Sequence, residues 1–145
     1  MTVKAFIILT AILTTRVSQY GEGIMRQVLQ TRIDCPAWLY GMCIDEASVP
    51  KDWEILLAAV SCDEIGNVYW FKNPVNGFWE KGFVVDCASP YLLRPDGQTA
   101  EEWMDAWGIG FEVDYDTAKR WQLGKSIPVV YYTERVQAYY LKLCP

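Results

Sequence analysis

The chain has 145 residues, of which 52% are hydrophobic and 21% charged, which fits one folded domain and excludes a disordered or collagen-like chain. Thirteen basic and 18 acidic residues give a net charge of −5, so nucleic acid, which needs a basic surface, is not an expected partner. The chain contains no histidine, which excludes Ser-His-Asp and Cys-His catalysis and all His-containing zinc sites. Any catalytic group should therefore be a carboxylate, tyrosine, cysteine or lysine.

The N-terminal segment, residues 1–15, contains an apolar run from Ala5 to Leu13 that follows Lys4. The run is shorter than the ~20 residues that cross a bilayer, so no stable membrane span is expected. Its size and flanking charge are typical of a secretory signal peptide, which would make the protein secreted or part of the cell envelope. The same residues also fit a first buried strand. That alternative leaves a cytoplasmic or virion-associated location open.

Short apolar segments rich in β-branched and aromatic residues predict most of the remaining structure. A first strand from Arg16 ends in a glycine-rich turn, and the segment 25–33 fits either a strand or a helical turn. Further strands are predicted at 53–61, 68–71, 78–85, 111–113 and 127–133. The turn between the second and third of these contains Asn73-Pro74 and Asn76-Gly77, which are strong turn signals.

Two short helices are predicted in the second half of the chain. Thr99 and Glu102 have the spacing of a capping box and begin a helix that runs to Trp107. Asp116 is the expected cap of a helix over 117–123. Many short strands, two short helices and no βαβ alternation predict a mostly-β small barrel.

The five cysteines include no Cys-x-x-Cys pair, so the sequence predicts no metal site. A disulfide between Cys35 and Cys43 would close the loop between them. Cys62 and Cys87 each follow a predicted apolar strand, a position that suits a bond between strand ends. The alternative is that all cysteines are reduced and buried, and Cys144 is left over in either case.

Short motifs occur along the chain in a recognisable order. They are a first strand ending in Tyr20-Gly21-x-Gly23, a buried strand leading to Ser61-Cys62, a hairpin leading to Val84-Val85-Asp86-Cys87, and Val113-Asp114 before a short helix. In this order they resemble the RlpA-like double-psi β-barrel family, a six-stranded fold shared with expansins and barwin-type proteins. The resemblance implies a mostly-β, six-stranded double-psi β-barrel domain over 16–135 and a C-terminal tail over 136–145.

The resemblance also implies a cell-wall glycan as partner, which is peptidoglycan for RlpA-like lytic transglycosylases and plant wall polysaccharide for expansins. Tyr20 and Gly21 match the family's Tyr-Gly pair, and Cys62 and Cys87 are placed like a cysteine pair found in family members. No cofactor is implied. Active members also use a histidine, which this chain lacks, so an enzyme and a binding protein both remain open.

If the protein cleaves a glycan, one carboxylic acid must protonate the glycosidic oxygen. Asp86 and Asp114 match the two aspartates of the family, and each follows an apolar strand, so they are the candidate catalytic pair. A lytic reaction needs one acid/base, because a hydroxyl of the sugar itself is the nucleophile. The alternative roles are a turn acceptor for Asp86 and a helix-start residue for Asp114.

If the protein only binds a glycan, aromatic rings near turns and loops are the candidate stacking platforms. These candidate substrate-binding residues are Tyr20, Trp38, Trp79 and Tyr91. Trp103 and Trp107 lie one helical turn apart, which is typical of a helix face packed on a core. A third alternative is a structural or interaction protein on the same barrel, and the sequence leaves its oligomeric state open.

Overall fold

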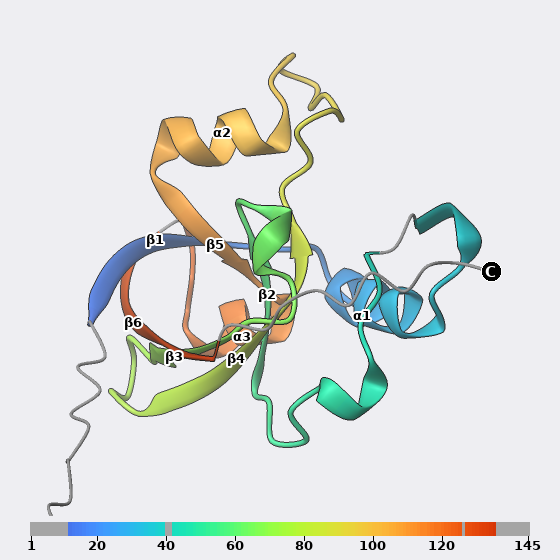
Figure 1. Ribbon diagram of the computed structural model, residues 1–145. Helices are drawn as coiled ribbons and strands as arrows, with labels where there is room; N and C mark the ends of the chain where they lie inside the picture. Colours follow the sequence, from blue (N-terminus) through green and yellow to red (C-terminus); the bar gives the residue numbers. More distant parts are fainter. Residues whose placement is uncertain (1–11, 40–41, 126, 136–145) are drawn as a thin grey trace, which may run out of the picture.

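The computed structural model describes residues 12–39, 42–125 and 127–135, and its centre is a closed barrel of six strands (Figure 1). The strands are β1 (Leu13–Gln19), β2 (Ile55–Ala59), β3 (Val68–Lys72), β4 (Trp79–Cys87), β5 (Ile109–Val113) and β6 (Ile127–Arg135). All six coincide with predicted strands to within a few residues, so the mostly-β six-stranded barrel is confirmed. β1 begins at Leu13, inside the segment 1–15, and residues 1–11 lie outside the described part of the chain.

The strands close the barrel in the order β1-β5-β2-β4-β3-β6. β1 pairs with β5 and β2 pairs with β4 in parallel, while the other four pairs are antiparallel. Each parallel pair contains one shift of register, at Arg16/Val17 in β1 and at Leu57/Ala58 in β2. A mixed barrel of this kind is compatible with the double-psi arrangement.

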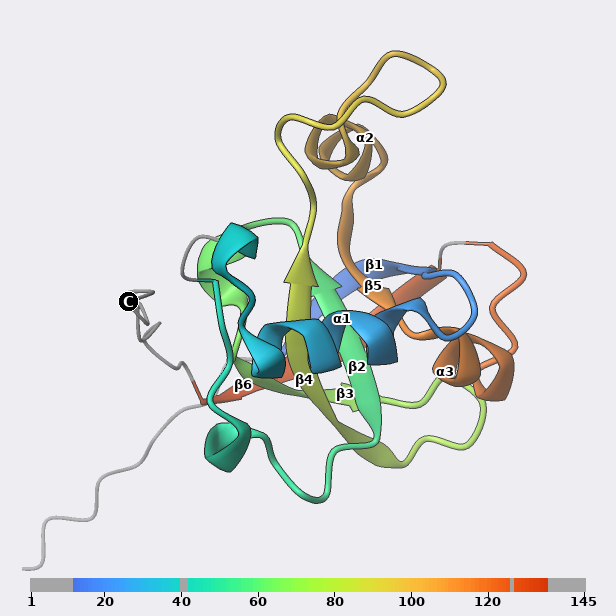
Figure 2. The same cartoon turned by 90° about the vertical axis from the view of Figure 1, so that its right-hand side faces the viewer.

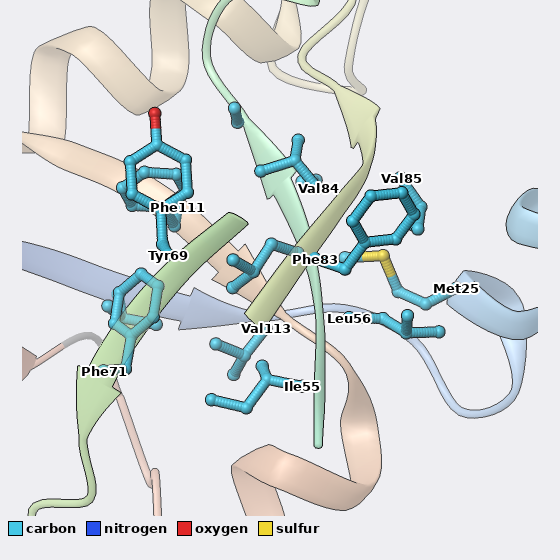
Figure 3. Packing of buried hydrophobic residues seen from close by; sticks show 14 of the residues in the cluster. Met25, Ile55, Leu56, Tyr69, Phe71, Phe83, Val84, Val85, Phe111 and Val113 are labelled. Atoms are coloured by element: carbon cyan, nitrogen blue, oxygen red, sulfur yellow. The ribbon is translucent and has the colours of Figure 1, made fainter. Parts of the chain in front are cut away.

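The barrel interior is filled by aromatic and branched side chains (Figure 3). Tyr69 and Phe71 of β3 pack edge-on against Phe111 of β5, with ring centroids 4.9 and 5.3 Å apart. Alternation along β5 buries Phe111 and Val113 and leaves the residue between them on the other face. Every residue of β2 is buried, which shows that this strand is covered on both of its faces.

The outer cover of β2 and β4 is helix α1 (Ile24–Asp34), which lies across both strands (Figure 2). This helix occupies the segment that the sequence left open between strand and helical turn. Its cap, Gly23, has a left-handed backbone with φ of 70° and makes no side-chain capping bond, and only Met25 and Arg32 are buried. The usual signals of a helix start and of an apolar face are therefore weak here.

The two predicted helices are present as α2 (Ala100–Trp107) and α3 (Tyr115–Arg120). The capping box of Thr99 and Glu102 at α2 is confirmed. The cap of α3 is Asp114, not Asp116 as predicted, because the chain turns into the helix directly after β5.

Helix α2 stands away from the barrel on an excursion between β4 and β5 (Figure 1). Trp103 packs against the small apolar cluster beneath this helix, as expected for a helix face on a core. The prediction that Trp107 packs on the same core is wrong, because Trp107 is 61% exposed.

Disulfides join Cys35 to Cys43 and Cys62 to Cys87, which confirms both predicted pairs and overturns the alternative of reduced thiols for these four residues. Two disulfides are typical of a protein that folds in an oxidising compartment. Cys144 and the tail over 136–145 lie outside the described residues. Within the described part of the chain, no helix is both long and apolar enough to traverse a bilayer.

Candidate functional site

A cavity of about 510 Å³ lies at one end of the barrel. At this end β4 leads into the excursion that carries α2 (Figure 2). Its walls come from the turn after β1, the end of β4, the loop 88–99, helix α2 and β5. The side chains that matter chemically are Tyr20, Asp86, Leu92, Arg94, Trp103 and Glu112. The cavity therefore combines two carboxylates, a guanidinium and aromatic rings.

Asp86, the penultimate residue of β4, is held by two donors. The hydroxyl of Tyr20 donates to its Oδ2 at 2.8 Å, and Nη2 of Arg32 donates to its Oδ1 at 2.7 Å. Burial, followed by the charge of Asp86, raises the pKa of the Tyr20 hydroxyl, so the tyrosine remains a donor. Both contacts fix the orientation of the carboxylate.

Arg32 is the partner of Asp86 that the sequence did not indicate. Its side chain is 6% exposed, and its Nη1 also donates to the carbonyl of Met42 at 2.8 Å. Arg32 comes from α1, the helix that the sequence left undecided. No motif in this segment distinguishes Arg32 from its neighbours, so the sequence carried no signal for it.

Glu112 of β5 is the second carboxylate of the cavity, and sequence reasoning missed it. It lies between Phe111 and Val113, whose side chains fill the barrel, so its own side chain points to the other face. Burial is the main cause that raises the pKa of Glu112, and the negative charge of Asp86 adds to it. A hydrogen bond of 3.2 Å from the Ser18 hydroxyl and the charge of Arg94 act in the opposite direction.

The strand register explains why the two carboxylates meet. Ala58 of β2 pairs with Asp86 of β4 on one side and with Glu112 of β5 on the other. Paired residues share a face of the sheet, and neighbouring strands lie about 4.8 Å apart, so the two backbones are separated by about 10 Å. Because alanine is small, Ala58 forms a floor between the carboxylates and leaves space above it.

Asp114, the other predicted catalytic aspartate, does not line this cavity. Its Oδ1 accepts hydrogen bonds from the Leu56 amide at 2.9 Å and the Thr117 hydroxyl at 2.7 Å, and its Oδ2 accepts from the Thr117 amide at 3.0 Å. These bonds cap α3 and tie it to β2. A catalytic role for Asp114 stays a prediction, whereas its structural role is visible in these contacts.

The candidate stacking residues are found in three places. Tyr20 lies in the cavity, and Tyr91, which is 86% exposed, stands on the loop beside it. Trp38 lines a neighbouring cavity of about 310 Å³, of which Asp86 also forms part of the wall. Trp79 lies apart from both cavities, at the start of β4, with its ring 5.0 Å from that of Tyr132.

In the described part of the chain, no three Asp, Glu, Cys or His side chains gather as a metal ion would require. No protein-family model matches this chain, and no curated protein and no solved structure matches it either. Fold and site therefore define the class: a closed, mixed six-stranded β-barrel with two carboxylates facing each other across a cavity.

Proposed function

We propose that this protein is exported and acts on a cell-wall polysaccharide, with peptidoglycan as the first substrate to test. Cleavage takes place in the cavity between Asp86 and Glu112. The observation that carries the proposal is the pair of carboxylates flanking Ala58, one ion-paired to Arg32 and the other half-buried with a raised pKa. The two disulfides and the resemblance of the motif order to RlpA-like barrels support export and a wall glycan.

Glu112 is the general acid in this proposal. A raised pKa keeps a carboxyl group protonated at a pH where an ordinary one is ionised, which is what proton donation to a glycosidic oxygen requires. The hydroxyl of Ser18 is its one hydrogen-bond donor in the described structure, and Glu112 lines the cavity, so its second oxygen is available to a ligand. Glu112 thus replaces Asp114 as the second carboxylate of the catalytic pair that the sequence predicts.

Asp86 supplies the negative charge. As Glu112 transfers its proton to the leaving oxygen, positive charge develops on the sugar carbon, and a fixed carboxylate stabilises it. Tyr20 and Arg32 act as positioning residues, because each holds one oxygen of Asp86. The backbone separation of about 10 Å leaves room for a glycosidic linkage between the two groups.

The bond cleavage can end in two ways. In a lytic reaction a hydroxyl of the same sugar attacks the carbon, and the Glu112 carboxylate takes up the hydroxyl proton, which yields an anhydro sugar and restores the acid. In hydrolysis, water attacks instead and a carboxylate accepts one proton from it. The lytic route needs only one acid/base, so it is compatible with a chain that contains no histidine.

The second candidate function is glycan binding without cleavage. Both oxygens of Asp86 already accept a hydrogen bond, which favours a structural anchor at that position over a freely reacting group. Tyr20, Trp38 and Tyr91 would then supply stacking surfaces along the two cavities that meet at Asp86.

The test is a pull-down on insoluble peptidoglycan and on cellulose, followed by mass spectrometry of the soluble fraction. We expect the parent protein to bind peptidoglycan and release soluble fragments, Glu112→Gln to bind without release, and Glu22→Gln to behave like the parent. Glu22 is an exposed glutamate outside the cavity, so it is the matched control. If the parent binds peptidoglycan but releases nothing, the second candidate function is supported. If the parent shows no binding and no release, both candidate functions are contradicted.

A further inference from the structure

Arg94 is a cation in the cavity wall that the proposed chemistry does not use. It stands on the loop 88–99, whose backbone is fixed by a short antiparallel contact between Leu93 and Thr99. The Arg94 amide donates to the Gln98 carbonyl at 2.7 Å, and the Gly97 amide donates to the Arg94 carbonyl at 2.9 Å. This tight turn gives the arginine a defined starting position.

The guanidinium of Arg94 is further oriented by a ring. Its central carbon lies 4.2 Å from the ring centroid of Trp103 on α2, a cation–π contact that holds the planar group against the indole. Both residues line the cavity. The arginine is therefore set in place before any ligand binds.

Most of the hydrogen-bonding capacity of this guanidinium is unused. An arginine has five N–H donors, and Nε of Arg94 donates to Asp96 at 3.4 Å, a long contact between two exposed side chains. Within the described residues, no partner takes up the remaining four donors. Arg32, which lines the neighbouring cavity, differs because its Nη1 and Nη2 already donate to the Met42 carbonyl and to Asp86.

Among the described residues, Asp96 is the carboxylate that forms an ion pair with Arg94, and it contacts only Nε of the guanidinium. Glu112 is close enough for Arg94 to lower the pKa of its carboxyl group, but no hydrogen bond joins them, and burial and Asp86 raise that pKa. Asp86 is engaged by Arg32 and Tyr20. The cavity thus offers one oriented cation whose fork of donors matches a planar carboxylate.

We propose that Arg94, stacked on Trp103, binds the carboxylate of an acidic sugar, so that the glycan acted on in this cavity carries a free carboxyl group beside the scissile linkage. The inference rests on the proposed function. The carboxylate can come from a uronic acid or from the lactyl group of a peptide-free muramic acid, and both present the same planar anion. The apolar side chains of Leu92 and Leu93, which also line the cavity, face the ring of the same sugar.

The test compares binding of acidic and neutral forms of the same glycan. The probes are oligogalacturonate, its methyl ester, peptide-free peptidoglycan strands, and those strands with their lactyl carboxylates amidated. Dissociation constants are measured by calorimetry for the parent, Arg94→Gln, Arg94→Lys and Arg26→Gln. Arg26 is the matched control, because it also lies over a tryptophan ring, that of Trp53 at 5.2 Å, but outside this cavity.

We expect the parent to bind one acidic probe roughly 10- to 100-fold more tightly than its neutral form, the range for hydrogen bonds to a charged group. Arg94→Gln removes this preference, Arg94→Lys keeps part of it because the charge remains without the fork, and Arg26→Gln leaves it unchanged. Which acidic probe shows the preference identifies the source of the carboxylate.

Equal binding of acidic and neutral probes by the parent, or a preference that survives Arg94→Gln, overturns the inference and leaves the proposed function standing. Failure of the parent to bind any of the four probes contradicts the proposed function, and the inference falls with it. A thermal melt of each variant excludes loss of folding as the cause of weaker binding.

Discussion

Glu80 and Glu112 are two shielded glutamates of the same barrel, on strands β4 and β5 to either side of β2, and their surroundings differ. Glu80 at the start of β4 is 5% exposed and accepts hydrogen bonds from three side chains, those of Arg120, Trp121 and Asn73. Glu112 on β5 is shielded too, but it accepts one side-chain hydrogen bond, from Ser18, and opens to a cavity.

The contrast teaches how to separate a structural carboxylate from a reactive one. Donors to both carboxylate oxygens of Glu80 connect helix α3, through Arg120 and Trp121, to the barrel. Burial with few donors raises the pKa of the carboxyl group and leaves lone pairs unused, as for Glu112.

The largest expected effect is the loss of glycan cleavage in Glu112→Gln. Removal of a general acid typically lowers the rate by roughly 10²–10⁴-fold, and the amide keeps the shape of the side chain. Product release is measured by mass spectrometry, and the unfolding midpoint should change little. A variant as active as the parent contradicts the assignment of Glu112.

The corresponding change at Glu80 should affect stability. Glu80→Ala leaves the buried indole N–H of Trp121 without an acceptor, and we expect a loss of about 2–4 kcal/mol in the free energy of unfolding. The Arg120 side chain is 44% exposed, so solvent screening limits what its ion pair with Glu80 contributes to stability. Urea denaturation measures the loss, with Glu22→Ala as control. A loss below about 1 kcal/mol would show that the donor network is not what holds α3.

Asp114 should follow the behaviour of Glu80. Asp114→Ala removes the cap of α3 and its bond to the Leu56 amide, so we expect a loss of about 1–2 kcal/mol in unfolding free energy. Glycan release per folded molecule should stay at the level of the parent. A folded Asp114→Ala protein that releases no product would instead support the predicted catalytic role of Asp114.

The smallest effect is the pH dependence of stability. Because the pKa of Glu112 is raised in the folded protein, its stabilising contribution is fully present below its unfolded pKa of 4.5 and is lost as the pH rises through the folded pKa. The stability of the parent relative to Glu112→Gln should therefore fall as the pH rises from 4 upward. Glycan cleavage needs the protonated form of Glu112, so the activity should decline over the same range of rising pH. If the stability difference between the parent and Glu112→Gln does not change with pH, the raised pKa of Glu112 is contradicted.

The barrel could be predicted because its strands alternate visibly or are apolar throughout, as in 53–61 and 127–133. Helix α1 could not, because it has a glycine cap and few buried residues, and Arg32 was missed with it. Sequence reasoning considered the residues at strand ends, which include Asp86. Glu112 lies inside a strand, and only the register that pairs both carboxylates with Ala58 reveals that they meet.

The most direct test of the account is product release from peptidoglycan by four proteins side by side: the parent, Glu112→Gln, Asp86→Asn and Asp114→Asn, each corrected for its folded fraction. We expect fragments from the parent and Asp114→Asn and little or none from Glu112→Gln and Asp86→Asn. Release by Glu112→Gln at the level of the parent, or its loss in folded Asp114→Asn alone, would contradict the assignment of the cavity as the catalytic site.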